Sequence, residues 1–125
     1  MVTVVAAIIR RNDRILITRR FDHVHLPGLW EFSGGKVEPG ESLRAALRRE
    51  IREELGVDIS VEDEYFTTDH QYPAKKVRLH FFNCTLQTGE PRAIEVADLK
   101  WVSPSEIDSF PFPEADRELV ARLRG

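Results

Sequence analysis

The sequence predicts an α/β fold in which strands flank one long helix and shorter helices close the chain. Apolar and β-branched runs occur on both sides of residues 43–55, as expected for buried strands. Residues 43–55 repeat apolar side chains every three or four positions, which is typical of a helix with one buried face. At 125 residues the chain is long enough for one core. We therefore expect a single domain over residues 1–125.

The first elements predict a hairpin. Residues 3–10 form an apolar run typical of a buried strand, and residues 14–20 return as a second strand. Asn12 and Asp13 between them are turn residues, which favours a hairpin connection. Residues 29–32 predict a further short strand.

The long helix has recognisable ends. The segment 34–40 begins with Gly-Gly and ends with Pro-Gly, which indicates a constrained loop. Ser42 follows as a plausible N-cap, and Gly56 is a C-terminal stop signal. The helix is therefore expected between these two residues.

The second half predicts three strands and two helices. Residues 57–68 and 76–86 are expected to be strands, and residues 97–102 the last one. A cap residue followed by proline at the first helical position begins a short helix at 103–106. Residues 114–123 predict the closing helix.

Three glutamates lie where a surface helix normally places apolar residues. At about 100° per residue, Glu50 and Glu54 fall in the same arc as Leu43, and Glu53 borders it. Acids at these spacings destabilise a helix by roughly 0.2–0.5 kcal/mol per pair, and burial would raise their pKa values. A divalent cation removes the conflict, and oxygen-only ligands suit Mg²⁺. The alternative is an exposed helix stabilised by ion pairs such as Arg49–Glu53.

The segment 35–57 resembles the Nudix box without a departure. The matching positions are filled by Gly35, Glu41, Arg49, Glu50, Ile51, Glu53, Glu54, Gly56 and Val57. The flanking residues 29–36 are similar to the MutT-like branch, which often has proline or alanine where Ser33 stands. This resemblance implies a Nudix-type α/β/α sandwich with a mixed β-sheet between helices.

The resemblance also implies a metal site. Such enzymes bind Mg²⁺, with Mn²⁺ as the alternative ion, and hydrolyse a nucleoside diphosphate linked to another group. By motif position, Glu53 and Glu54 are expected to be metal ligands, and the carbonyl of Gly34 is expected to complete the metal shell. Glu50 is expected to be a ligand or to activate water, and Arg49 to orient the glutamates.

A further acid follows from the resemblance alone. Glu95 matches a catalytic or metal-binding glutamate in a family loop. A plain loop acid fits equally well, because Glu90 is close in sequence.

Six positions are implied in substrate binding. They are Arg20, His25, Phe32, Lys36, Lys75 and Asp116. Arg20 matches an arginine directed at phosphate, which suits a permanently charged bidentate donor, and His25 matches a position near the sugar and base. The alternatives are ordinary ones: a solvated cation for Arg20, an uninvolved loop side chain for His25, a core position for Phe32 and solvent contact for Lys36.

Asp116 bears on the choice of base. It aligns with a position that is asparagine in relatives cleaving 8-oxo-dGTP, while the CTP pyrophosphohydrolase branch has a similar Ala-Asp. An ionised aspartate only accepts hydrogen bonds. It could accept from the N7–H of oxidised guanine or from the amino group of cytosine. A helix-start cap is the alternative for this residue.

The predicted function is a Mg²⁺-dependent nucleoside triphosphate pyrophosphohydrolase that releases nucleoside monophosphate and pyrophosphate. We expect a nucleotide-pool sanitiser acting on 8-oxo-dGTP. The alternatives are hydrolysis of CTP, dCTP or modified pyrimidine triphosphates, and, in another class, a non-catalytic nucleotide-binding module.

Composition limits the partners. The net charge of −3 does not favour a nucleic-acid polymer, and the early apolar run, residues 4–9, is too short for a membrane span. No signal peptide is visible. The single cysteine, Cys84, excludes an internal disulfide and fits the cytoplasm. The chain is expected to act as a monomer or a homodimer.

Overall fold

A central strand, β1, organises the sheet. The computed structural model describes residues 1–23 and 27–125. In chain order its elements are β1 (Val2–Arg11), β2 (Arg14–Arg19), β3 (Trp30–Glu31), β4 (Gly34–Lys36), α1 (Leu43–Leu55), β5 (Asp58–Gln71), β6 (Lys76–Thr88), β7 (Asp98–Val102), the 3₁₀ segments η1 (Pro104–Ser109) and η2 (Glu114–Asp116), and α2 (Arg117–Arg124). None of the helices in the described residues is both long and apolar enough to cross a bilayer.

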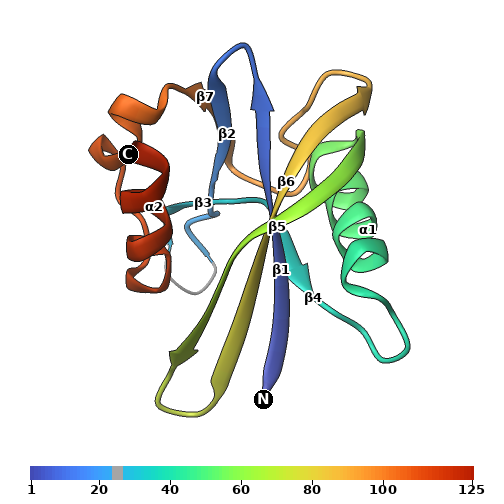
Figure 1. Ribbon diagram of the computed structural model, residues 1–125, viewed down its shortest axis with the longest axis vertical. Coiled ribbons are helices and arrows are strands. Elements are labelled where there is room, and N and C mark those ends of the chain that lie inside the picture. The colour runs from blue at the N-terminus through green and yellow to red at the C-terminus, as the bar shows by residue number, and fades with distance from the viewer. Residues whose placement is uncertain (24–26) are drawn as a thin grey trace.

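The sheet is mixed, as predicted. β1 runs parallel to β6 and antiparallel to β4, and it pairs with β2 at the hairpin end. The order is β3-β2-β1-β6-β5, with β7 added to β2 and β4 to β1. Helices α1 and α2 lie on opposite sides of this sheet, and the β5–β6 hairpin extends beyond them (Figure 1).

Alternating side chains of β1 build two cores. Val5, Ala7 and Ile9 pack with the apolar side of α1, including Leu47. Ala6 and Ile8 point to the other face, where they pack with α2 and η1. Because successive residues of a strand face opposite ways, one strand supports both layers. The predicted α/β/α sandwich is confirmed.

Local sequence chemistry sets the hairpin turn and the limits of α1. The Ser42 hydroxyl accepts a hydrogen bond from the Ala45 N–H at 3.1 Å. Gly56 adopts the left-handed conformation, with φ of 69°, as a helix-terminating glycine does. Asn12 and Asp13 also have positive φ, 51° and 62°, which matches a two-residue hairpin turn.

Two predicted boundaries were wrong. Residues 34–36 are a strand and not a loop, because Gly34 approaches β1 so closely that a Cβ there would lie 1.9 Å from the Val5 carbonyl oxygen. The closing helix begins at Arg117, because residues 114–116 form a 3₁₀ turn in which the Asp116 side chain makes no cap hydrogen bond.

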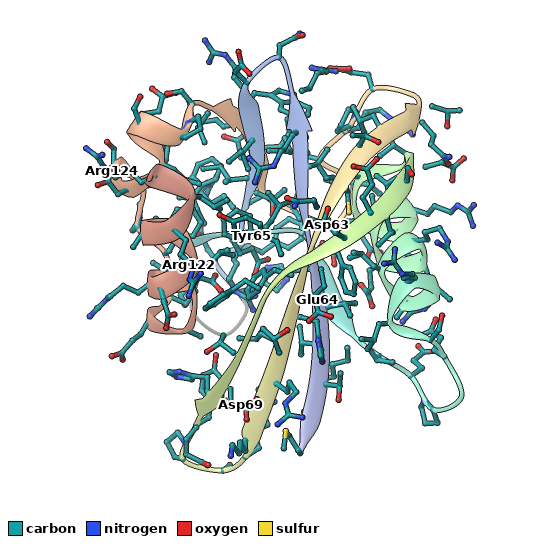
Figure 2. The ribbon with its side chains drawn as sticks, viewed as in Figure 1. Asp63, Glu64, Tyr65, Asp69, Arg122 and Arg124 are labelled. Atoms are coloured by element: carbon teal, nitrogen blue, oxygen red, sulfur yellow. The ribbon has the colours of Figure 1, made fainter. Side chains whose placement is uncertain are left out.

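The hairpin strands β5 and β6 are longer than predicted. β5 continues to Gln71 and β6 to Thr88, and the added residues are polar, so they do not continue the hydrophobic alternation that predicts a strand. Asp69, for example, accepts a hydrogen bond of 2.8 Å from Arg78 across the hairpin. Figure 2 shows Asp63 and Glu64 on β5 over the middle of the sheet and Asp69 towards the hairpin end.

One buried hydroxyl should be dispensable for stability. Thr18 is fully buried, and its Oγ1 has no hydrogen-bond partner among the described residues. A buried polar group without a partner costs free energy, so Thr18→Val is expected to raise the free energy of unfolding by about 1 kcal/mol. Urea unfolding would measure it, with Thr85→Val, whose exposed hydroxyl bonds Glu62, as a near-neutral control. A clear loss of stability in Thr18→Val would contradict this expectation.

Candidate active site

A pocket of about 300 Å³ opens beside α1 and the strands around β1. Its lining includes Gly34, Gly35, Glu54 and Glu95. A second hollow of about 600 Å³ adjoins it and is lined by Tyr72, Lys75 and Ala115, among others. Both share Arg20, Glu31 and Asp116 as lining residues. The fold therefore brings most of the predicted site residues into one continuous depression.

Of the three helix acids, Glu54 is the one that lines the smaller pocket. The Ser33 hydroxyl donates a hydrogen bond of 2.6 Å to Glu54 Oε1. Burial raises the pKa of Glu54 well above its usual range, Glu50 and Glu31 act in the same direction, and the bond from Ser33 opposes them. A carboxyl with this surplus of negative charge around it is suited to a cation.

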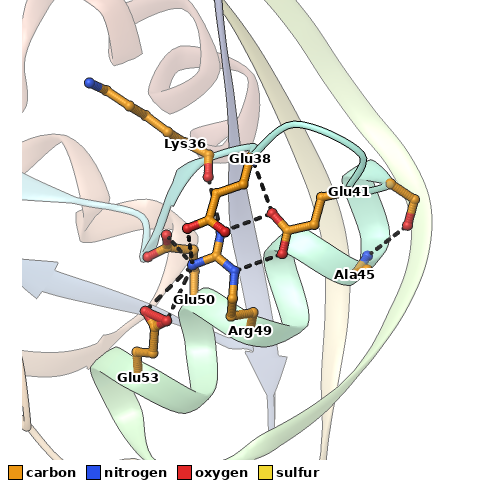
Figure 3. A network of polar contacts seen from close by, with 8 residues as sticks. Lys36, Glu38, Glu41, Ala45, Arg49, Glu50 and Glu53 are labelled. Carbon is orange, nitrogen blue, oxygen red and sulfur yellow. Dashed lines mark hydrogen bonds and ion pairs between the residues drawn. The ribbon is translucent and has the colours of Figure 1, made fainter.

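Arg49 is the centre of a network of carboxylates. It binds Glu41 through two hydrogen bonds of 2.7 and 2.9 Å, which lower the pKa of Glu41 to about 2. Its Nη1 lies 2.9 Å from Glu50 Oε1 and 3.2 Å from Glu53 Oε1. Figure 3 shows the guanidinium surrounded by these acids. The geometry supports the predicted orienting role and gives Glu41 the role of holding Arg49.

In the part of the chain that the structure describes, no three acidic, histidine or cysteine side chains converge closely enough to hold a metal. The guanidinium of Arg49 supplies the positive charge between Glu50 and Glu53 instead. The residues nevertheless fit a hard divalent cation, because their donors are all oxygens and their charge is in excess. Gly35 gives Glu50 its space, since a Cβ there would lie 2.4 Å from the Glu50 carboxyl carbon.

The loop before β7 favours Glu95 over Glu90 as the functional acid. Glu95 lines the smaller pocket, and the N–H groups of Ile94 and Glu95 each donate to the Glu54 carbonyl at 3.1 Å. These bonds satisfy a carbonyl at the end of α1 that has no helical partner. Glu90 is instead bound by Arg11 through hydrogen bonds of 2.7 and 3.0 Å.

A buried acid faces the second hollow. Asp116 is 8% exposed, and burial raises its pKa to about 7, with Glu31 adding to the rise and Arg20 opposing it. Asp116 stands at the N-cap position of α2, but its side chain forms no cap hydrogen bond. Arg20 donates to Glu31 at 2.8 Å and lines both hollows, so it stands between the two parts of the site.

Of the other four predicted substrate-binding residues, two line the pockets, one extends away from the acids and one lies outside the described residues. Phe32 is buried and stacks on Phe112 at 5.5 Å between ring centroids, yet it also lines the smaller pocket. Lys75 lines the larger hollow. The Lys36 carbonyl accepts a hydrogen bond from Arg49, while its ammonium extends away from the acids (Figure 3). His25 lies outside the described residues.

Sequence reasoning did not select Glu31 or Ser33, which both contact the site. Their position in the sequence, within three residues before Gly34, could have identified them. Each is a polar residue beside buried aromatic Phe32, and a polar side chain in such a position normally has a partner.

Comparisons with known proteins point to one family. A family model described as the NUDIX domain matches residues 4–122. The chain is 41% identical over 120 residues to the CTP pyrophosphohydrolase of Escherichia coli K12, covering 96% of this chain and 89% of that protein. It is 35% identical over 121 residues to the 8-oxo-dGTP diphosphatase of Haemophilus influenzae, covering 95% and 89%. The solution structure of the E. coli ORF135 protein is similar with a TM-score of 0.86 and 39% identity, covering 100% of this chain and 91% of that one.

The buried Asp116 should make stability depend on pH. Its pKa rises from 3.8 to about 7 on folding, so the native state favours the protonated form, and this contribution is lost as pH rises through 7. Asp116→Asn removes the ionisation. The stability gained by this variant over the wild type should be larger at pH 8 than at pH 5. Urea unfolding in the presence of a chelator would measure both, and an equal difference at the two pH values would contradict the assignment.

Proposed function

Because the chain belongs to the Nudix family of hydrolases, we propose that it is a Mg²⁺-dependent nucleoside triphosphate pyrophosphohydrolase that removes 8-oxo-dGTP. Residues 1–125 would form its one catalytic domain. The observation that carries the proposal is the placement of Glu54 and Glu95 in a pocket with Gly34, next to a hollow of about 600 Å³. Such a pair of spaces suits phosphates on one side and a base on the other.

In the proposed reaction, water attacks a phosphorus of the triphosphate and the bridging P–O bond breaks. The products are nucleoside monophosphate, pyrophosphate and a proton. When bound, Mg²⁺ would neutralise phosphate charge and lower the pKa of a bound water. Glu53 and Glu54 would hold the ion with the Gly34 carbonyl. Glu50 would share this role or accept the proton from water.

The supporting residues would keep this arrangement in place. Arg49 is held by Glu41 through two hydrogen bonds while it contacts Glu50. Glu95 lines the same pocket and would act beside Glu54, because its backbone N–H donates a hydrogen bond to the Glu54 carbonyl. Holding reacting groups in one geometry lowers the entropic part of the barrier.

Asp116 would select the base. With a pKa of about 7, it is partly protonated at neutral pH. The protonated form can donate to O6 of oxidised guanine, as asparagine would, and the ionised form can accept from N7–H.

CTP and dCTP are the second candidate substrates. A buried carboxylate would accept from the amino group of cytosine, and the relative with 41% identity is a CTP pyrophosphohydrolase. A non-catalytic binding module is disfavoured, because every glutamate of the box is present.

The metal assignment predicts a large effect at Glu54. Glu54→Gln is expected to lower turnover at least about a hundredfold, because it removes a charge that stabilises the reaction, with little loss of folding. Pyrophosphate release at saturating Mg²⁺ would measure it. Glu118→Gln changes an exposed acid of α2 and should behave as the wild type. Retained activity in Glu54→Gln would contradict the assignment.

The base assignment predicts a preference that changes with pH. Because the proton donor is lost above pH 7, kcat/KM for 8-oxo-dGTP relative to dCTP should fall about tenfold between pH 6 and pH 8, the size expected for one hydrogen bond. Asp116→Asn should show a flat ratio. A ratio favouring dCTP or CTP at every pH would identify the second candidate as the substrate class.

A further inference from the structure

We propose that Ser33 is a positioning residue that fixes the Glu54 carboxylate for metal binding. The inference rests on the proposed function, because it concerns the ligand set of the same site. It adds a side chain for which the Nudix box specifies no role.

Ser33 is well placed to hold another side chain still. It is 2% exposed, and its Oγ lies 2.6 Å from Glu54 Oε1. Its carbonyl accepts a hydrogen bond of 2.9 Å from the Ala7 N–H, which anchors it to the central strand β1. The donor is therefore fixed by the most buried part of the sheet.

The hydrogen bond from Ser33 gives the two carboxylate oxygens of Glu54 different roles. Oε1 accepts the hydrogen bond from the hydroxyl, so in this proposal Oε2 is the oxygen left for a cation. The main chain of Glu54 is fixed independently, because its carbonyl accepts from Ile94 and Glu95 at 3.1 Å. Both ends of this residue are thus oriented before any ion arrives, which is the usual contribution of groups behind a metal ligand.

The Ser33 hydroxyl orients the Glu54 carboxylate without adding positive charge. An arginine in its place would orient Glu54 but would also neutralise it, as Arg49 does for Glu50 and Glu53. Ser33 leaves the negative charge available to a cation. Alanine or proline at this position would have no side-chain donor for the Glu54 carboxylate.

The next residue links Ser33 to a second expected ligand. Gly34 is pressed against β1, where an added Cβ would lie 1.9 Å from the Val5 carbonyl oxygen. The Ser33 hydroxyl and the Gly34 carbonyl therefore belong to one rigid segment. The hydrogen bond from Ser33 thus connects the Glu54 carboxylate to the segment that carries this carbonyl.

The test is a Mn²⁺ titration followed by electron paramagnetic resonance, with no nucleotide present. Ser33→Ala is expected to bind Mn²⁺ about tenfold more weakly than the wild type, the lower end of the range for groups that orient a metal ligand. Thr18→Val is the matched control, because it removes a buried hydroxyl that bonds nothing among the described residues. Its affinity should equal that of the wild type.

A double-mutant cycle separates positioning from a general structural effect. If Ser33 acts through Glu54, Ser33→Ala should change Mn²⁺ affinity little in a Glu54→Gln background. A full tenfold loss in that background would overturn the proposal. Should Ser33→Ala fail to fold in a chelator, Ser33→Cys keeps a weaker donor of similar size and should show an intermediate affinity.

The outcomes distinguish this inference from the proposed function. Wild-type protein that neither binds Mn²⁺ nor releases pyrophosphate would refute the function itself. Wild-type protein that does both, together with a Ser33→Ala variant of unchanged Mn²⁺ affinity, would refute only the role of Ser33.

Discussion

The concentration of negative charge at the C-terminal end of α1 is the constraint on which the candidate site depends. Glu53 and Glu54 occupy the last turn of this helix, where the helix dipole already disfavours acids. The arrangement persists because several neighbours compensate for it. Arg49 pairs with Glu50 and Glu53, and Ser33 donates to Glu54. An acid cluster maintained at this cost is a reason to assign it a function.

The rest of the fold keeps these acids in place. β1 supports α1 on one face and α2 on the other. The helix α1 therefore cannot move away from the sheet without disrupting the core that it shares with β1. Gly34 allows β4 to lie close to β1, and Gly35 allows it to approach Glu50, at distances that a side chain would prevent. The loop ending at Glu95 covers the end of α1. Stability and the candidate site therefore rely on the same contacts.

The sequence predicted those features of the fold that depend on interactions between neighbouring residues. Ser42 and Gly56 limit α1 as expected, because a cap and a left-handed glycine act on their own neighbours. The motif also predicted that Arg49 would lie among the glutamates of α1, and it pairs with Glu50 and Glu53. The motif could not predict that Gly34 begins a strand, since this depends on close approach to β1. Nor could it find Ser33, whose partner is 21 residues away along the chain. The burial that shifts the pKa of Asp116 likewise arises from tertiary packing.

The guanidinium of Arg49 has a consequence for ion selectivity. It already places one positive charge between Glu50 and Glu53, while Glu41 retains it through two further bonds. In the proposed enzyme, an incoming ion must therefore offer the carboxylates more than this internal cation does. A monovalent ion brings no additional charge and has little advantage over the guanidinium, whereas a divalent ion does. Arg49 would therefore compete with an incoming ion for these carboxylates. The site would discriminate among ions by charge before coordination geometry is considered.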